Sequence, residues 1–329
     1  MLVSRQAPNP RTMDDLLPAE LVARLERLDV HTRKMFPGKM QGERRSKRRG
    51  RGVEFHDFRG YVRGDDIRFI DWNIVARFGK LFVRLFVEEE DLALHIVVDA
   101  SSSMDTGDPN KLLFASRVAM SLGYIGLVRQ NRVGMTVFGR PGVENPRIHP
   151  DARGRHRVRS LADFMLREIW EDETHGTEGG ASGKGGDFNS ALSLIARSGI
   201  GKGVVVVLSD FLIEGGYERG LRDLSAAGGG GAHDVYCLQV LSPSELEPER
   251  ELERGVSGDL RMTDIESGHA SEITITAPLV KRYKERVANY CADLESFCAA
   301  RGMTHMLVRS DADISRLIME TLRQRGMLA

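Results

Sequence analysis

Residues 94–103 have the sequence Leu-His-Ile-Val-Val-Asp-Ala-Ser-Ser-Ser, an almost continuous apolar run that ends in one acidic and three hydroxyl side chains. A strand covered on both faces is apolar almost throughout, whereas a half-exposed strand alternates apolar and polar residues. The run therefore predicts a buried strand of a parallel sheet. Asp99 and the serines after it are then placed at the carboxyl end of that strand, where such sheets bind ligands.

The rest of the chain alternates between strand and helix patterns. A second apolar run, residues 204–208, ends in Ser209 and Asp210. Alternation of this kind predicts parallel strands connected by helices, so the expected fold class is α/β with a doubly wound, mainly parallel sheet. The expected strands are residues 94–99, 132–138, 203–210, 234–241 and 304–309, and the expected helices are residues 111–130, 157–170, 187–197, 217–227, 278–301 and 313–324. We also expect a hairpin of residues 260–266 and 272–276 before the long helix.

The first 90 residues have a different pattern. Thr12 and Asp15 have the spacing of a helix start, and leucines recur at helical spacing up to about Val30, which predicts one amphipathic helix. Residues 39–51 hold seven Lys or Arg and one Glu, which is typical of a flexible basic loop. Short aromatic and β-branched stretches at residues 53–58, 67–70 and 81–87 then predict the strands of a small β-rich module. We therefore expect two domains, residues 1–90 and residues 91–329.

The composition limits the classes of protein. With 41% hydrophobic and 29% charged residues, the chain can bury a full core, which excludes disordered and fibrous classes. The 47 basic residues balance the 47 acidic ones, which disfavours a surface devoted to nucleic acid. Three cysteines favour a reducing compartment. No run approaches the roughly 20 apolar residues of a membrane span, and no signal-peptide pattern occurs, so we expect a soluble cytoplasmic protein.

The acidic strand ends suggest a metal site. If the two apolar strands are neighbours, Asp99 and Asp210 reach the same edge of the sheet, and a tight bend can direct the hydroxyls of Ser101 and Ser103 to the same point. Mg²⁺ prefers oxygen ligands of this kind and tolerates several waters. We therefore expect an ion here that stays open to an acidic side chain of a partner.

The pattern Asp99-x-Ser101-x-Ser103 with a downstream Asp210 resembles the metal-ion-dependent adhesion site of von Willebrand factor A-type domains, over roughly residues 91–329. That resemblance implies partner binding through the ion. The family also contributes a threonine, and the matching position here is Gly186. The Mg²⁺ site is therefore incomplete unless Asp187, Asn189, water or the glycine-rich loop of residues 174–186, which we expect to be mobile, completes it. The expected metal ligands are Asp99, Ser101, Ser103, Asp187 and Asp210.

A second resemblance is carried by residues 59–72, Arg-Gly-Tyr-Val-Arg-Gly-Asp-Asp-Ile-Arg-Phe-Ile-Asp-Trp, and by Asp264-x-Glu266-x-Gly268. These stretches resemble the domain-of-unknown-function 58 family, in which such a signature precedes an A-type domain. Members of that family are commonly associated with MoxR-type AAA+ ATPases. The resemblance therefore implies a non-enzymatic adaptor in chaperone-like protein assembly or metal insertion, with the client left open.

Two charged segments have alternative interpretations. The cluster of Asp65, Asp66, Arg68 and Asp71 is predicted as a turn braced by ion pairs with Trp72 as a core anchor, and its alternative is a docking surface. The basic loop of residues 39–51 is predicted to be solvated, because the aromatic side chains that stack on bases are missing from its arginine-rich part. Its alternative is nucleic-acid binding.

Enzyme motifs come close but are incomplete. Gly183-Lys184 is followed by Gly185 where a phosphate-binding loop needs Ser or Thr, and Ser101 stands where an aspartyl-phosphate phosphatase has its second acid. We therefore expect no enzymatic activity. The alternatives are a metal-dependent phosphoester hydrolase and a structural scaffold without an ion. Cys291 and Cys298 lie seven residues apart on one predicted helix and are expected to pack in the core.

Overall fold

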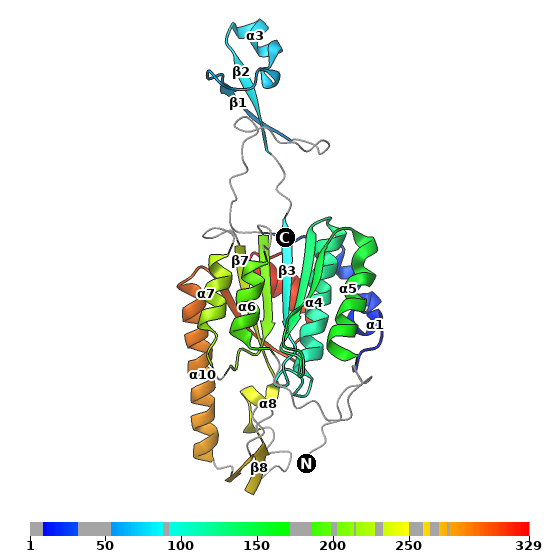
Figure 1. The fold of residues 1–329 in the computed structure, drawn as a ribbon, viewed down its shortest axis with the longest axis vertical. Coiled ribbons are helices and arrows are strands. Elements are labelled where there is room, and N and C mark those ends of the chain that lie inside the picture. The colour runs from blue at the N-terminus through cyan, green and yellow to red at the C-terminus, as the bar shows by residue number, and fades with distance from the viewer. Residues whose placement is uncertain are drawn as a thin grey trace. The chain divides into compact units, whose positions relative to one another are not determined.

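The chain forms two compact units in a computed structural model that describes residues 9–31, 54–87, 92–171, 186–198, 203–213, 215–227, 233–249, 259–263, 270–274 and 277–328 (Figure 1). The sheet unit combines Met1–Lys34 with Leu92–Ala329, and the inserted unit is Met35–Asp91. The predicted boundary near residue 90 matches the end of the inserted unit, but residues 1–34 belong to the sheet unit rather than to an N-terminal module.

The sheet unit contains a six-stranded sheet in the order β10-β7-β6-β3-β4-β5. All neighbouring strands are parallel except β5, which runs antiparallel to β4 at one edge, so the predicted mainly parallel α/β sheet is confirmed. β5 was not predicted, because its mostly exposed side chains lack an apolar run. The strands are β3 Ala93–Asp99, β4 Arg132–Phe138, β5 Arg147–Ala152, β6 Gly203–Ser209, β7 His233–Leu241 and β10 Thr304–Arg309.

Helices cover both faces of this sheet (Figure 1). Leu94, Ile96 and Val98 pack in one core with α4 and α5, while Val97 packs in a second core with α6, α7 and α10. The alternation of side chains along a strand explains why the central strand must be apolar on both sides. The helices are α4 Lys111–Val128, α5 Val158–Met165, α6 Phe188–Arg197, α7 Glu218–Ala226, α8 Pro243–Leu246, α10 Ala277–Ala299 and α11 Ile314–Arg316, with further helical turns η2 Arg155–Arg157, η3 Leu166–Trp170 and η4 Leu317–Leu322.

The N-terminal segment packs on the first of these cores. It forms two short helices, α1 Met13–Leu16 and α2 Ala19–Leu25, rather than one, because Pro18 between them has no backbone N–H to continue the first helix. The buried side chains Leu16, Leu17, Leu21, Leu25 and Leu28 all belong to the core that contains α4. The backbone N–H of His31 also donates to Met327 O at 2.8 Å, which joins the two ends of the sheet unit.

We predict that Leu25→Ala lowers the free energy of unfolding by about 3 kcal/mol, because it removes a fully buried side chain and leaves a cavity. Urea unfolding at neutral pH measures the effect. The matched control is Leu194→Ala on α6, where the leucine is 44% exposed and we expect a change below about 0.5 kcal/mol. Equal effects of the two substitutions would contradict the assignment of residues 9–31 to the sheet unit.

One described helix, α4, meets the length and composition of a membrane span, although its sequence suggested no such run. Of its 18-residue window, 83% is buried inside the sheet unit. α4 is therefore the core helix between the sheet and the N-terminal helices.

Burial lowers the pKa of His95 to about 4 in the middle of β3, although the Asp151 carboxylate acts to raise it. The ring nitrogen Nε2 lies 2.9 Å from Thr136 Oγ1. Unfolding exposes the imidazole to water, where its pKa is about 6.5. The stability contributed by neutral His95 is therefore present above pH 6.5 and is lost as the pH falls towards 4.

We predict that between pH 7 and pH 5 the protein loses about 2 kcal/mol more of its free energy of unfolding than a His95→Gln variant, which has no imidazole to protonate. Urea unfolding at a series of pH values measures this difference. Parallel pH profiles for the two proteins would contradict the buried neutral state of His95.

The inserted unit consists of an antiparallel pair, β1 Glu54–Gly60 and β2 Phe82–Val87, with a turn η1 Ile67–Phe69 and a helix α3 Trp72–Phe78 between them. The small two-stranded sheet agrees with the predicted β-rich module. Residues 67–70 were expected as a strand but mostly form the turn, because the Asp66 carboxylate accepts from the backbone N–H of Arg68 at 3.0 Å.

A second antiparallel pair, β8 Asp259–Thr263 and β9 Ala270–Thr274, confirms the hairpin expected before the long helix α10.

Candidate functional site

The two predicted acidic strand ends meet at the carboxyl edge of the sheet. Asp99 is the last residue of β3, Asp210 follows the last residue of β6, and Val98 pairs with Leu208 in the parallel register of these neighbouring strands. The chain continues from β3 to β4 on one side and from β6 to β7 on the other. Such a reversal of strand order is where doubly wound sheets bind their ligands.

Asp99 is held by hydrogen bonds from both neighbouring segments. Its Oδ1 accepts from the backbone N–H of Ser101 at 3.0 Å, and its Oδ2 accepts from Ser209 Oγ at 2.6 Å. Gly139 allows this close packing, since its φ is +80° and a Cβ there would lie 2.9 Å from Asp99 Oδ1. Burial and the nearby Asp210 carboxylate raise the pKa of Asp99 to about 6.

The bend after Asp99 directs two hydroxyls towards each other. Ser101 Oγ and Ser103 Oγ lie 3.1 Å apart within hydrogen-bond distance, and the three serines of the bend are half-buried. The predicted convergence of these hydroxyls is therefore observed. The loop then reaches α4, where the Asn110 side chain accepts from the backbone N–H of Leu113 at 2.9 Å and caps the helix.

Asp210 is more deeply enclosed than the sequence suggested. It is 1% exposed, and its Oδ1 accepts from the backbone N–H of Leu212 at 3.1 Å. Its own carbonyl accepts from Gln239 Nε2 at 3.0 Å. The following residue, Phe211, has a φ of +57°, a conformation that bulky side chains rarely adopt. This turn fixes the carboxylate against the end of α4.

Lys111 is the partner of Asp210 that sequence reasoning missed. It is the first residue of α4 and is 0% exposed, with its Nζ 2.9 Å from Asp210 Oδ2 and 2.6 Å from Glu245 Oε1. Burial acts to lower the pKa of Lys111, but the two carboxylates outweigh it and raise the pKa above its ordinary value. A lysine in the first turn of a helix is usually solvated, so its sequence position gave no signal.

Gly186 and Asp187 contribute differently from the expectation. The backbone N–H of Gly186 donates to Val143 O at 3.1 Å, and a Cβ on Gly186 would lie 2.2 Å from Glu144 O. A threonine at this position would therefore require the backbone of residues 143–144 to move. Asp187 is exposed and caps α6, since its Oδ2 accepts from the backbone N–H of Ser190 at 2.9 Å.

These contacts do not fit the predicted divalent ion. Asp210 Oδ2 is ion-paired with Lys111, and Asp187 caps a helix. Asn189, the other candidate, donates to Gly216 O and accepts from the backbone N–H of Gly220, both at 2.7 Å. In the described part of the chain, no group of three or more His, Cys, Asp or Glu side chains is arranged to hold a metal ion. An octahedral oxygen shell would require several of these bonds to break.

The charged cluster of the inserted unit is braced by ion pairs, as predicted. Arg59 pairs with Asp65 at 2.8 Å, Arg68 pairs with Asp66 at 2.6 Å, and Arg84 pairs with Asp71 at 2.7 Å. Asp71 also caps α3 by accepting from the backbone N–H groups of the second and third helical residues.

The expectation that Trp72 anchors the core is wrong, because its side chain is 64% exposed within the inserted unit. Trp72 is the first residue of α3, immediately after the capping Asp71. Among the side chains of this unit whose burial the structure describes, Ile70 and Val83 are buried and apolar, and their backbones form an antiparallel bridge.

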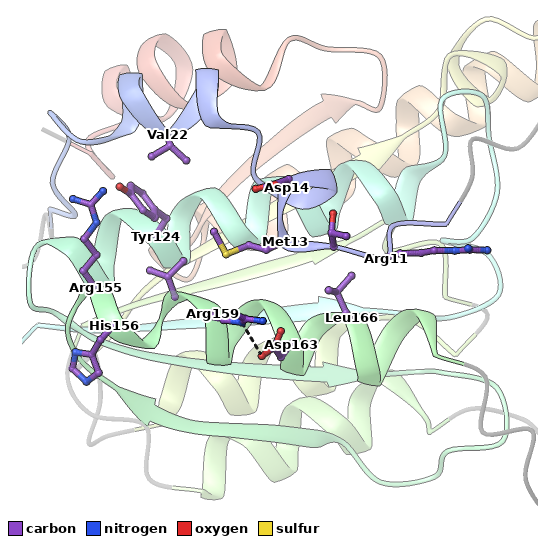
Figure 2. A pocket seen from close by; sticks show the side chains of 12 residues that line it. Arg11, Met13, Asp14, Val22, Tyr124, Arg155, His156, Arg159, Asp163 and Leu166 are labelled. Carbon is purple, nitrogen blue, oxygen red and sulfur yellow. Dashed lines mark ion pairs between the residues drawn. The ribbon is translucent and has the colours of Figure 1, made fainter.

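A separate cleft of about 620 Å³ lies between the N-terminal helices and α4 and α5 (Figure 2). Arg155 pairs there with Glu26 at 2.9 Å, and its guanidinium lies 6.0 Å from the centre of the Tyr124 ring. Arg159 and Asp163 line the opposite wall on α5 (Figure 2). The cleft follows the seam where α1 and α2 pack on the sheet unit, and no sequence pattern predicted it.

Three sequence predictions lie outside the described residues. They are the basic loop of residues 39–51, residues 174–185 of the glycine-rich loop of residues 174–186, and the motif Asp264-x-Glu266-x-Gly268.

Among known proteins, the chain is similar to curated relatives without an assigned function. It is 28% identical over 322 residues to uncharacterized protein Rv1480 of Mycobacterium tuberculosis and to uncharacterized protein Mb1516 of Mycobacterium bovis, covering 96% of this chain and 93% of each relative. It is also 30% identical over 185 residues to uncharacterized protein MAV169 of Mycobacterium avium, covering 55% of this chain and 96% of that relative.

Among solved structures, the pilus adhesin SpaC from Lactobacillus rhamnosus GG matches 72% of this chain and 30% of its own, with 11% identity and a TM-score of 0.38. The family model described as "Protein of unknown function DUF58" matches residues 57–292, which span the inserted unit from β1 onwards and most of the sheet unit. The chain therefore belongs to the DUF58 family.

Proposed function

We propose that this protein is a non-enzymatic adaptor that binds another protein through the carboxyl edge of its sheet. The observation that carries the proposal is the meeting of Asp99, the serine bend and Asp210 where the strand order reverses. The serines of the bend are half-buried and therefore accessible to a partner, while the buried and hydrogen-bonded side chains of Asp99 and Asp210 make the edge rigid. A rigid edge with accessible hydroxyls suits recognition of a protein surface.

We further propose that the sheet unit is of the von Willebrand factor A type. Supporting this are the strand order β10-β7-β6-β3-β4-β5, the antiparallel edge strand β5, and the position of Asp99-x-Ser101-x-Ser103 at the end of the central strand. The resemblance implies a binding domain rather than a catalytic one.

The proposed partner is a MoxR-type AAA+ ATPase, and the proposed setting is chaperone-like protein assembly or metal insertion. Family membership supports this choice, because the resemblance that implies DUF58 also implies such an ATPase. Around the bend, Asp105 and Asp108 are exposed, so the edge suits a partner loop that brings basic or hydrogen-bond-donating side chains. No step of this docking runs through Mg²⁺, because Asp210 is ion-paired with Lys111 and Asp187 caps a helix.

A binding experiment with a purified MoxR-type ATPase from the same organism tests the adaptor role. Ser102→Arg puts a bulky side chain into the bend, and we expect it to weaken capture by at least about tenfold, or ~1.4 kcal/mol. The matched control is Ser296→Arg on the exposed side of α10, which should bind like the unmodified protein. Unchanged capture by a folded Ser102→Arg variant would reject the edge as the docking site.

A second candidate, a metal-dependent phosphoester hydrolase, is favoured by one observation. Asp99 is a buried carboxyl with a pKa of about 6 beside a second carboxylate, and perturbed acids of this kind cluster at catalytic sites. A phosphatase and nuclease screen with Mg²⁺ and Mn²⁺ tests this alternative. Turnover that is lost in Asp210→Ala would favour hydrolysis over adaptor function.

A further inference from the structure

We propose that the ammonium group of Lys111 is the resident cation of the carboxyl edge and takes the place that a divalent ion holds in an adhesion site of the A type. This inference deepens the proposed function and rests on it in one respect, the consequence that the partner protein docks without a metal ion. That the chain itself supplies the cation follows from the contacts of Lys111 alone.

Lys111 contacts two acidic side chains at this edge, and a third lies near one of them. Its Nζ is 2.9 Å from Asp210 Oδ2 and 2.6 Å from Glu245 Oε1, and Asp99 lies close enough to Asp210 to feel its charge. Buried carboxylates without a cation are strongly unfavourable, because they have lost their hydration. The ammonium therefore supplies the positive charge that the edge requires.

The contacts bring together segments that are far apart in the chain. Asp210 follows β6 and Glu245 lies on α8 after β7, at separations of 99 and 134 residues from Lys111. Glu245 is itself fixed, since its Oε2 accepts from the backbone N–H and the Oγ of Ser242 at 2.6 and 2.9 Å. Lys111 thus joins the ends of two neighbouring strands, as a shared metal ion would.

The backbone of Lys111 is also held in place. Its N–H donates to Thr106 O at 3.0 Å, and Ser310 Oγ donates to Pro109 O at 2.7 Å. Gly107 packs so closely on Ser242 that a Cβ there would lie 2.7 Å from the Ser242 Cβ. With its side chain fully buried, Lys111 has no direct route to solvent by which it could make way for a metal.

Divalent ions are therefore expected to compete poorly for this edge. A metal would have to displace the ammonium from Asp210 or place a second cation beside it, and like charges at this distance repel strongly in a buried site.

Metal titration of the full chain tests the proposal by thermal unfolding and by calorimetry. For the unmodified protein, we expect millimolar Mg²⁺ or Mn²⁺ to shift the midpoint by less than about 1 °C relative to chelator, with no saturable heat of binding. For Lys111→Met, we expect a lower midpoint in chelator and a saturable rise of several degrees with Mn²⁺. Lys281→Met, which removes an exposed lysine of α10, is the matched control and should behave like the unmodified protein.

Two results would overturn the proposal. One is saturable Mg²⁺ binding by the unmodified protein that disappears in Asp210→Asn, and it can be observed even if Lys111→Met does not fold. The other is a folded Lys111→Met variant whose midpoint does not respond to Mn²⁺. Since neither measurement uses a partner protein, a failure to capture the ATPase would reject the adaptor role and leave this inference standing.

Discussion

Lys111→Met should lower the free energy of unfolding by about 3–5 kcal/mol, because it removes one side of a buried ion pair and leaves a desolvated charge behind. The Glu245 side chain is 21% exposed, so water can solvate its carboxylate after the ammonium is lost, whereas the Asp210 carboxylate is almost completely buried and stays desolvated. Methionine keeps the length and apolar stem of lysine, so the change isolates the lost charge. Urea unfolding at neutral pH measures the effect.

A double-mutant cycle separates the charge from the packing. Lys111→Met combined with Asp210→Asn should be more stable than Lys111→Met alone, since the second change removes the orphaned carboxylate and keeps a side-chain oxygen for the backbone N–H of Leu212. The exposed Lys281→Met change should cost less than about 0.5 kcal/mol. A cost below about 1 kcal/mol for Lys111→Met would show that the ion pair is dispensable.

Gly203→Ala should cost more than about 4 kcal/mol or prevent folding, because the start of β6 lies directly against the backbone of the central strand. A Cβ on Gly203 would be 1.9 Å from Ala93 O and 2.7 Å from Ala93 N. These are backbone atoms that cannot rotate away, so β3 and β6 would have to separate where they pair. Yield of folded protein and thermal unfolding measure the outcome.

Gly215→Ala is the matched control for this substitution, since a Cβ on Gly215 would meet nothing within 4 Å. We expect it to change the free energy of unfolding by less than about 0.5 kcal/mol. If Gly203→Ala and Gly215→Ala unfold at the same temperature, the result would contradict the close pairing of β3 with β6 at Gly203.

The sequence predicted the sheet well because its signal is local. The apolar runs ending in Asp99 and Asp210 each report burial on two faces, and parallel strands necessarily bring their carboxyl ends to one edge. The juxtaposition of the two carboxylates followed from that geometry alone. By contrast, the edge strand β5 carries mostly exposed side chains and gives no such pattern.

The cation of the site could not be predicted because its contacts are distant in sequence. Nothing within a turn of Lys111 distinguishes it from a solvated lysine at a helix start, and its partners lie directly after β6 and on α8. The exposure of Trp72 was missed for a related reason, since a large aromatic residue indicates burial only when the surrounding fold provides a core. The local sequence pattern determines which residues form helices and strands, whereas contacts between distant segments determine which side chains are buried.

The division of the sheet unit by the inserted residues 35–91 has a consequence for biosynthesis. During translation, α1 and α2 emerge before any part of the surface that covers their leucines, because α4 and α5 lie after the insertion. The inserted unit can fold first, while the apolar side chains of residues 9–31 stay exposed until the ribosome has synthesised α4 and α5. Nascent chains are therefore expected to require shielding by a general chaperone until residue 165 has left the exit tunnel.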